Sequence, residues 1–412
     1  MLGTVFAVSQ LAIERKFDSM GHFGKMVIGR REVLGMGTSI LAGSALAGCA
    51  SSGDSQGVST DVATDVSVAA AQGNVRILGR TYEEDGVTWL PLSGSAIEFV
   101  ATGERVELEL VGNESAKNKA DFCPRYAVLV DGEVAVDETL TEQSRVVAVD
   151  LQDANAEATV RLMLLSEANG GPVGIRSVKV TNAAGASVGP SEPKGLSIGF
   201  IGDSMTCGYC VEATSNDATF QTTTENFMKS YAYLAAQELD ADHEAVCYSG
   251  FGVVSGFTGN GDLNGDWVLP PVYELVVKGR DEVWDFAAHP KDVIVLNLGT
   301  NDLSYVGVDE GRTAEFVEGY TEFLDKIREL NPDSYIICTV GTMWGAGVLY
   351  PSIEKAIADH ANRMGDERIT SYLSDPINTK TDTTVANGHP DAEGHRKIAE
   401  QLVGVVRQVL QA

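Results

Sequence analysis

The chain has 412 residues, of which 44% are hydrophobic and 21% are charged. This length accommodates two domains with full-sized cores, and the composition is that of a globular protein in water. The formal net charge of −28 argues against nucleic acid as a partner and against adsorption to an anionic membrane surface.

The N-terminal segment has the features of an export signal. Arg30-Arg31 precedes a short apolar run that closes on Leu46-Ala47-Gly48-Cys49. Paired arginines before a weakly hydrophobic stretch resemble a Tat signal, and Leu-Ala-Gly-Cys resembles a bacterial lipobox, in which the cysteine is lipidated. The run is too short and too rich in Gly, Ala and Ser to span a membrane well. We therefore predict that residues 1–48 are an export signal, with Met26 as an alternative start.

The signal predicts where the protein resides. Cys49 would anchor it as a lipoprotein on the outer face of the bacterial cell membrane, and the lipid would be its only membrane contact. Residues 49–73 are rich in Ser, Asp, Val, Thr and Ala without a large aromatic side chain, which is typical of a flexible tether.

Residues 74–184 have the pattern of an all-β domain. Short runs of alternating apolar and polar residues follow one another, and Asp131-Gly132 between two of them is a hairpin signal. We predict a jelly-roll-like β-sandwich. Such a sandwich could bind carbohydrate or could support the next domain and shape one wall of its cleft; the lack of a clear aromatic cluster favours support. A Gly/Ser/Pro-rich join at 183–195 follows.

Residues 195–412 alternate between strand-like and helix-like segments. The strand-like ones are apolar and bounded by turns, and the helix-like ones carry apolar residues at helical spacing. This rhythm predicts an α/β domain with a doubly wound parallel sheet. The expected strands are 196–201, 244–248, 292–298 and 335–340, and the expected helices are 226–239, 313–330, 353–363 and 392–411.

A serine follows the first of these strands directly, in Gly202-Asp203-Ser204. Open α/β sheets place their ligands at the carboxyl ends of their strands. A serine on a sharp strand-to-helix turn exposes its hydroxyl, and nearby backbone N–H groups can hold an oxyanion. The simpler interpretation is a helix-capping serine, because Gly-Asp-Ser is a common tripeptide.

Three more polar stretches follow predicted strands or precede the last helix. Ser249-Gly250-Phe251-Gly252 offers backbone N–H groups that a ligand can approach, and Gly299-Thr300-Asn301-Asp302 places a side-chain amide at a strand tip. His389 stands just before the last predicted helix, which Pro390 and Asp391 can start.

Gly-Asp-Ser, Ser-Gly-x-Gly, Gly-Thr-Asn-Asp and His-Pro, in this order, resemble the four blocks of the SGNH (GDSL-type) hydrolases. The preceding β-sandwich, with 93–99 and 130–132, is similar to carbohydrate esterase family 2, whose members deacetylate plant polysaccharides. The resemblance covers nearly all of the chain after the tether. It implies no metal and no cofactor, and no His, Asp and Cys cluster has metal-ligand spacing.

The resemblance implies a role for each matching residue. Ser204 would be the nucleophile and His389 its general base and later general acid, because a serine needs a base to take its proton. The N–H groups of Ser204 and Gly252 and the amide of Asn301 would form the oxyanion hole, each contributing roughly 3 kcal/mol. Gly250 is the alternative to Gly252. His395 is the alternative base, but packing or capping suits it better.

The chain departs from the family pattern near the base. Many relatives carry an Asp two or three residues before the catalytic His, and here these positions are Asn387 and Ala386. Some esterases of the family work as a Ser–His dyad in which a backbone carbonyl holds the imidazole. The amide oxygen of Asn387 or a distant carboxylate such as Asp375 are further alternatives, and a complete triad is not expected.

Two other features bear on the cleft. Trp344, in a loop after a predicted strand, would lie near it and either stack on a sugar ring or cover the sheet edge. Cys207-Gly-Tyr-Cys210 has C-x-x-C spacing, but it lacks a second such pair and a thioredoxin-like context. We interpret both cysteines as structural, with a local disulfide as the alternative.

Taken together, these observations predict an exported, lipid-anchored serine esterase that removes O-acetyl groups from a poly- or oligosaccharide. A lipase or thioesterase with a longer acyl pocket is an alternative within the same fold. A catalytically silent carbohydrate-binding lipoprotein is the alternative from another class, although a pure binder would not need Ser204, Asn301 and His389 together. The particular carbohydrate and the oligomeric state stay open.

Overall fold

The computed structural model describes residues 65–182, 185–341, 343, 345–375 and 384–411. Residues Ala63–Ala412 form one compact unit. The predicted export signal and the predicted lipidation site, Cys49, lie outside the described residues. None of the described helices is long and apolar enough to cross a membrane.

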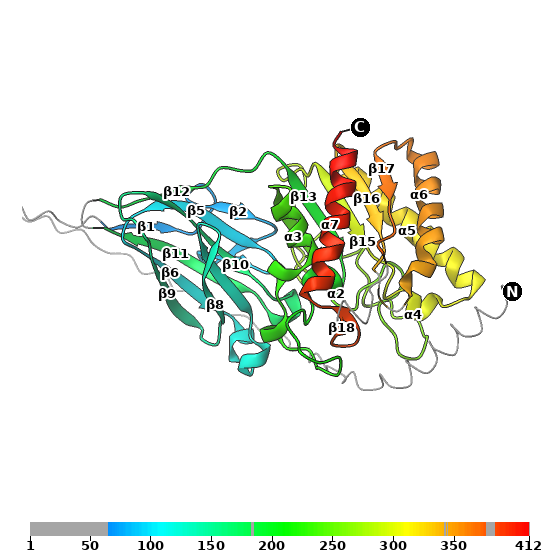
Figure 1. Cartoon of the computed structure of the whole chain (residues 1–412), viewed down its shortest axis with the longest axis horizontal. Helices are drawn as coiled ribbons and strands as arrows, with labels where there is room; N and C mark the ends of the chain where they lie inside the picture. The colour runs from blue at the N-terminus through cyan, green and yellow to red at the C-terminus, as the bar shows by residue number, and fades with distance from the viewer. Residues whose placement is uncertain (1–64, 183–184, 342, 344, 376–383, 412) are drawn as a thin grey trace, which may run out of the picture. The chain divides into compact units, whose positions relative to one another are not determined.

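The N-terminal half is a sandwich of two antiparallel sheets (Figure 1). The alternation read from the sequence places apolar side chains inward; in β6, for example, Val106, Leu108 and Leu110 are buried between partly exposed neighbours. The first sheet consists of β1 (Val66–Ala69), β3 (Tyr82–Glu84), β4 (Val87–Leu90), β6 (Arg105–Gly112), β9 (Ser144–Asp150) and β11 (Val173–Thr181). The second consists of β2 (Arg76–Leu78), β5 (Ala96–Thr102), β7 (Arg125–Val130), β8 (Glu133–Thr139), β10 (Glu157–Leu164) and β12 (Ser187–Pro190).

The hairpin between β7 and β8 turns where the sequence predicted it. Asp131 and Gly132 both have positive φ, at 51° and 85°, which is the backbone of the two-residue turn that joins antiparallel strands. The prediction of an all-β sandwich is confirmed.

Both ends of the sandwich extend beyond the predicted bounds of 74–184. β1 lies inside the segment predicted as a tether, where it pairs with β11, and β12 lies in the predicted join, where it pairs with β5. These two strands have four residues each. Strands this short leave little periodic signal, so only their pairing partners reveal them.

The C-terminal half contains a five-stranded, wholly parallel sheet in the order β14-β13-β15-β16-β17. Its chain runs from β13 to β14 on one side and then returns to β15 on the other, so the topology reverses between β13 and β15. The strands are β13 (Ser197–Gly202), β14 (Asp242–Cys247), β15 (Val293–Asn297), β16 (Tyr335–Thr339) and β17 (Ile369–Ser371).

Helices cover both faces of this sheet, as Figure 1 shows. Alternate residues of β13 face different layers: Phe200 packs with α3 (Tyr231–Glu238) and α7 (Ala392–Val409), whereas Ile201 packs with α5 (Glu310–Leu330) and α6 (Tyr350–Met364). The predicted doubly wound α/β fold is therefore confirmed. The helix expected at 226–239 is divided into a short 3-10 turn and α3, because the Ser230 hydroxyl accepts the Tyr233 N–H and starts a new helix.

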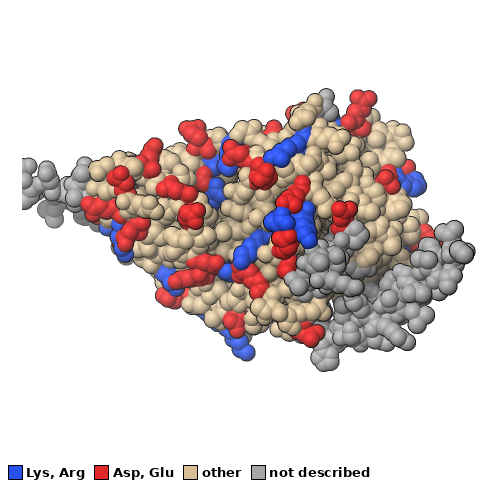
Figure 2. Space-filling model, viewed as in Figure 1, with Lys and Arg blue, Asp and Glu red and all other residues tan. Residues whose placement is uncertain are grey.

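Figure 2 shows Asp and Glu side chains spread over the visible face, with Lys or Arg beside many of them. This arrangement fits the strongly negative formal charge.

Candidate active site

The nucleophile candidate lies at the end of β13. Asp203, and not Ser204, caps the short helix α2 (Ser204–Cys207), since its Oδ1 accepts the Met205 N–H at 3.1 Å. The simpler interpretation of Ser204 as a capping residue is therefore wrong, and its hydroxyl is available for another partner. A Cβ on Gly202 would lie 2.0 Å from Thr206 Oγ1, so this tight turn requires glycine.

That partner is His389. Its Nε2 lies 2.8 Å from Ser204 Oγ, and its Nδ1 lies 2.8 Å from the carbonyl oxygen of Ala386. Because a carbonyl only accepts, Nδ1 carries the hydrogen and Nε2 presents the lone pair that takes the serine proton. Burial lowers the pKa of His389 to about 4, and the hydrogen bond to Ala386 opposes this shift less strongly. The imidazole is thus neutral at pH 7, as a general base must be.

A strained turn presents the orienting carbonyl. It connects β18 (Thr384–Val385) to β19 (His389–Pro390), and Ala386 and Asn387 within it have positive φ, at 26° and 61°. The Ala386 N–H donates to the Ser215 carbonyl and the Asn387 N–H to the Asn216 carbonyl, which fixes the turn on the loop that follows α2. The Tyr209 ring, on the same side, lies 4.6 Å from the His389 ring.

The structure thus gives the orienting position to a backbone carbonyl. The predicted alternative, the side-chain amide oxygen of Asn387, is not needed as an acceptor for His389 Nδ1, because Nδ1 already donates to the Ala386 carbonyl. Asp375 is exposed, and its backbone N–H donates to Gln401 Oε1. His395, the alternative base, is buried in α7, where its Nδ1 accepts the Tyr231 N–H; it packs, as expected.

Asn301 lies after β15, beside the same edge. Its Nδ2 donates to the Phe251 carbonyl at 2.8 Å and to Asp203 Oδ2 at 3.2 Å. Burial raises the pKa of Asp203 to about 7, and the nearby Asp302 carboxyl adds to the shift. Asn301 therefore connects the loop after β14 with the turn that carries Ser204.

Of the two glycines after β14, Gly252 is already engaged. Its N–H donates to the Trp267 carbonyl at 3.1 Å, and a Cβ there would lie 2.1 Å from the Ser255 carbonyl. Gly252 is thus required by packing within its loop, which weighs against it as an oxyanion donor. Gly250, with φ of 82°, remains as the alternative.

Asp302 has a role in the site that was not predicted from the sequence. Its buried carboxyl accepts the N–H groups of Val253, Val254 and Ser255 at 2.8 to 3.1 Å and so fixes the loop that contains both glycines. Burial raises its pKa to about 6 against the opposing effect of these N–H groups. The sequence offered one indication, because Asp302 directly follows Asn301. Only the fold shows which backbone N–H groups the Asp302 carboxyl accepts.

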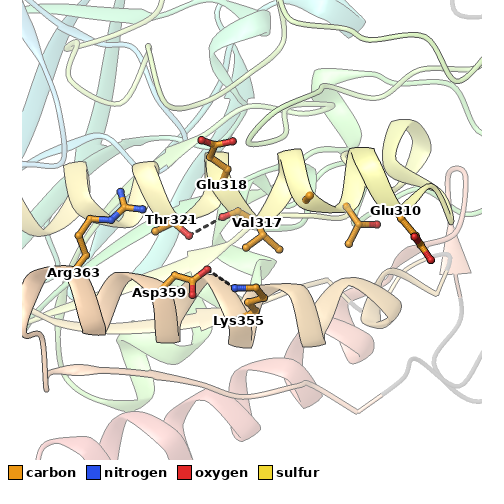
Figure 3. A pocket seen from close by; sticks show the side chains of 9 residues that line it. Glu310, Val317, Glu318, Thr321, Lys355, Asp359 and Arg363 are labelled. Atoms are coloured by element: carbon orange, nitrogen blue, oxygen red, sulfur yellow. Dashed lines mark hydrogen bonds and ion pairs between the residues drawn. The ribbon is translucent and has the colours of Figure 1, made fainter.

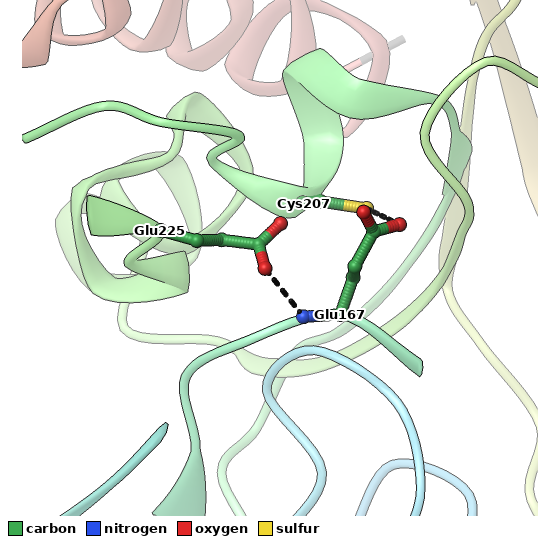
Figure 4. A group of neighbouring side chains, drawn as sticks. All are labelled: Glu167, Cys207 and Glu225. Carbon is green, nitrogen blue, oxygen red and sulfur yellow. Dashed lines mark hydrogen bonds between the residues drawn. The ribbon is translucent and has the colours of Figure 1, made fainter. Parts of the chain in front are cut away.

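Two predicted features near the cleft have different outcomes. Trp344 lies outside the described residues. Cys207 and Cys210 are both buried and have free thiols, so the local disulfide is absent. Cys207 belongs instead to a buried group with Glu167 and Glu225, whose ligand-type atoms all lie within 4.8 Å of one another (Figure 4).

A surface groove of about 460 Å³ lies elsewhere, between α5 and α6 (Figure 3). Val317 and Thr321 lie along it, and the Lys355 ammonium pairs with the Asp359 carboxylate at its rim. The groove contains none of the predicted catalytic residues.

The comparisons with known proteins agree with this geometry. Residues 200–397 match the GDSL-like Lipase/Acylhydrolase family. The predicted resemblance is confirmed: this segment matches the GDSL-type hydrolase family model, and the relatives and structural neighbours of the chain include carbohydrate esterases of family 2.

Two relatives illustrate this. The cellulase/esterase CelE of Acetivibrio thermocellus is 28% identical over 312 residues, which cover 75% of this chain and 37% of CelE. An acetylxylan esterase/glucomannan deacetylase of Cellvibrio japonicus is 24% identical over 346 residues, covering 83% of this chain and 91% of the relative. The chain thus spans little more than a third of CelE but nearly all of the second relative.

Solved structures share the fold. A family two carbohydrate esterase from Clostridium thermocellum, determined with cellohexaose, has a TM-score of 0.71 at 24% identity and covers 82% of this chain and 99% of its own. An acetyl xylan esterase from Butyrivibrio proteoclasticus has a TM-score of 0.74 at 21% identity, covering 84% and 99%.

Proposed function

We propose that this protein is a serine esterase that removes O-acetyl groups from carbohydrate. The observation that carries the proposal is the 2.8 Å contact between His389 Nε2 and Ser204 Oγ. It supplies a nucleophile with its base at the switch point of a parallel sheet. The sugar as substrate is supported by the relatives named above, which include an acetylxylan esterase/glucomannan deacetylase.

The chemistry follows from the atoms at the site. Ser204 Oγ attacks the acetyl carbonyl carbon while His389 Nε2 takes the serine proton. The carbonyl oxygen of the acetyl group then becomes an oxyanion. His389 then gives the proton to the departing sugar oxygen, leaving acetyl-Ser204. A water molecule, deprotonated by the same nitrogen, releases acetate and restores the serine.

The oxyanion needs donors that are already in place. The Ser204 N–H is in the first turn of α2, where backbone N–H groups have no helical acceptor. The Gly250 N–H and the Asn301 amide complete the set. Asn301 would replace its longer bond, 3.2 Å to Asp203, by one to the oxyanion. Each donor contributes roughly 3 kcal/mol to the transition state.

Export and lipid anchoring are part of the same proposal. Arg30-Arg31 and the Leu46-to-Cys49 motif support them. Mass spectrometry of protein extracted from bacterial membranes would find a lipidated Cys49 at the new N-terminus, and a Cys49→Ala variant would leave the membrane fraction. An unmodified Cys49 in membrane-extracted protein would overturn the anchor.

The esterase is tested by hydrolysis of 4-nitrophenyl acetate, butyrate and octanoate, followed by acetate release from acetylated xylan and glucomannan. Each assay compares the unchanged protein with the Ser204→Ala variant. Preference for acetate, lost in Ser204→Ala, is the expected result. Preference for octanoate would make the protein a lipase or thioesterase. No turnover above the Ser204→Ala level would favour a silent carbohydrate-binding protein.

A further inference from the structure

Glu167 is a carboxylate from the β-sandwich that reaches the catalytic half. It follows β10 and is 1% exposed. Its Oε2 accepts the backbone N–H of Ser249 at 2.8 Å, and the Cys207 thiol lies 3.9 Å from the same oxygen. One side chain of the sandwich therefore contacts both the helix that begins with Ser204 and the loop that contains Gly250.

A second buried acid completes the group. Glu225 is fully buried, and its Oε2 accepts the Glu167 backbone N–H at 2.9 Å. Its Oε1 has no hydrogen-bond partner and points toward Cys207 and the Glu167 carboxylate in Figure 4. Two carboxyl groups this close and this buried cannot both be ionised, so the pair retains a proton. The unpartnered Oε1 is the position for that proton.

The surrounding charges support this assignment. Arg125 donates to the Glu225 backbone carbonyl, but its side chain is already paired with Asp137 and Glu212. The other titratable groups that interact with the pair are the buried thiols of Cys207, Cys210 and Cys247 and the buried phenol of Tyr209. Burial raises the pKa of both glutamates, that of Glu225 well above its usual value.

We propose that Glu167 is a positioning residue of the sandwich that holds the oxyanion loop, and that the proton retained by Glu225 allows the Glu167 carboxylate to remain beside Ser249. This proposal rests on the proposed esterase function. Glu167 does not contact the substrate. It fixes the peptide next to Gly250, and a displaced N–H group stabilises the oxyanion less well.

The pH dependence has a defined sign. Below the raised pKa of the pair, Glu225 is neutral and the hydrogen bond to Ser249 is intact. As the pH rises through that pKa, the second negative charge repels the Glu167 carboxylate and the loop loses its support. Activity is therefore lost on the alkaline side, and a permanently neutral residue at position 225 removes this loss.

The test uses kinetics of the full chain on 4-nitrophenyl acetate, with active sites counted by a serine-reactive phosphonate. Glu167→Ala is expected to lower kcat about 10–100-fold with KM within about twofold, and Glu167→Gln about 3–10-fold, since its amide oxygen still accepts the Ser249 N–H. Glu225→Gln is expected to remain within about twofold at pH 7 and to lose the alkaline decline.

Glu244→Gln is the matched control. Glu244 is also a buried carboxylate that bonds a sandwich residue, Arg80, at 3.1 Å, but it contacts neither Ser249 nor Cys207 in the structure. It is expected to lower the melting temperature while leaving kcat per active site unchanged. Equal losses of kcat in Glu167→Ala and Glu244→Gln would overturn the positioning role, as would an alkaline decline that persists in Glu225→Gln.

A readout without turnover separates this proposal from the esterase proposal. Hydrogen exchange of the Ser249 N–H is expected to accelerate at least tenfold in Glu167→Ala and to stay unchanged in Glu244→Gln. If the unchanged protein hydrolyses no ester, the esterase proposal fails, while this measurement still tests the hold on Ser249. If Glu167→Ala does not fold, the test uses Glu167→Gln and Glu225→Gln. The positioning role would be overturned if Glu167→Gln has normal hydrogen exchange at Ser249 and normal kcat, and if Glu225→Gln keeps the alkaline decline of activity.

Discussion

Two buried histidines of this protein are held in opposite ways. In His360, on α6, Nδ1 lies 2.7 Å from Asp325 Oδ1 and Nε2 lies 3.0 Å from Asp366 Oδ2. In His389, the Ala386 carbonyl and the Ser204 hydroxyl take these two places. Both partners of His360 are carboxylates, whereas His389 has one carbonyl and one hydroxyl partner, and a hydroxyl can donate to a nitrogen that keeps its lone pair.

The two histidines differ in whether their hydrogen-bond partners are charged. Carboxylates join the helices of the α5–α6 layer, far in sequence from Ser204, and the catalytic edge relies on neutral hydrogen-bond partners for its imidazole. A carboxylate in place of the Ala386 side chain would lie in the apolar group of Tyr209, Cys210, Val385 and Ala386. An unpaired charge is costly in such surroundings.

The largest effect is expected when the imidazole of His389, the proposed base, is removed. His389→Ala is expected to lower kcat/KM for 4-nitrophenyl acetate by about 10⁴-fold or more, because Ser204 then has no base. The melting temperature is expected to change little, and steady-state kinetics with a thermal melt would measure both. A loss of less than 100-fold would mean that another group accepts the serine proton.

Breaking the other histidine's pairing acts on stability instead. Asp366→Ala leaves His360 and the buried Arg328 guanidinium without a carboxylate that both contact, and is expected to lower the free energy of unfolding by about 3–5 kcal/mol. Urea unfolding would measure it, with kcat per active site unchanged.

The control for Asp366→Ala is Lys355→Ala, which breaks the exposed pair with Asp359 (Figure 3). Its expected cost is about 0–1 kcal/mol. Equal costs for the two variants would contradict the distinction between a buried and an exposed pair.

The decline of activity at acid pH gives a further test of how the surroundings of His389 affect its pKa. In the proposed mechanism the neutral form of His389 is the active one, and burial lowers the pKa of His389 to about 4. The pH profile of kcat/KM is therefore expected to stay level from pH 7 to about 5 and to decline near pH 4. With an ordinary histidine pKa of about 6.5, only about 3% of the plateau would remain at pH 5. Half-maximal activity near pH 6.5 would contradict the effect of burial.

Stability follows the same histidine in a defined direction. The unfolded chain binds this proton near pH 6.5 and the folded chain only near pH 4, so His389 makes folding less favourable as the pH falls through this window. The profile should therefore be recorded with the active sites counted at each pH.

The smallest effect is expected at the turn before the base. Asn387→Gly keeps the N–H that donates to Asn216 and relieves a positive φ, so the free energy of unfolding is expected to change by less than about 1 kcal/mol. Activity is expected to remain within about twofold, because the Ala386 carbonyl stays on Nδ1. A loss above tenfold would show that the Asn387 side chain orients His389.

The sequence predicted much of the fold because its periodic segments are long. Four of the five strands of the parallel sheet (β13, β14, β15 and β16) and the helices α5, α6 and α7 were predicted within a few residues of their bounds. β1, β12 and β17 have three or four residues and depend on distant partners, so no local pattern could indicate them.

The residues whose proposed role belongs to a side chain could be predicted from the sequence. The residues whose proposed role depends on the position of a backbone N–H group could not. Ser204, His389 and Asn301 meet at one sheet edge because each stands next to the end of an element. Whether Gly250 or Gly252 offers its N–H depends on the bond from Gly252 to Trp267, which lies 15 residues later in the chain. The hold of Glu167 on Ser249 spans 82 residues and had no signal in the sequence.

The ribbon of β18 and β19 has a consequence for how the protein fails on heating. Among the residues that the structure describes, two pairs, Thr384 with Pro390 and Val385 with His389, join its strands, whereas Ser204 follows a central strand of the parallel sheet. Small, locally bonded segments open at lower free energy than the core around them. Warming would therefore release His389, the proposed base, before the strand next to Ser204 melts, and the proposed esterase activity would be lost while the protein is still folded and would return on cooling.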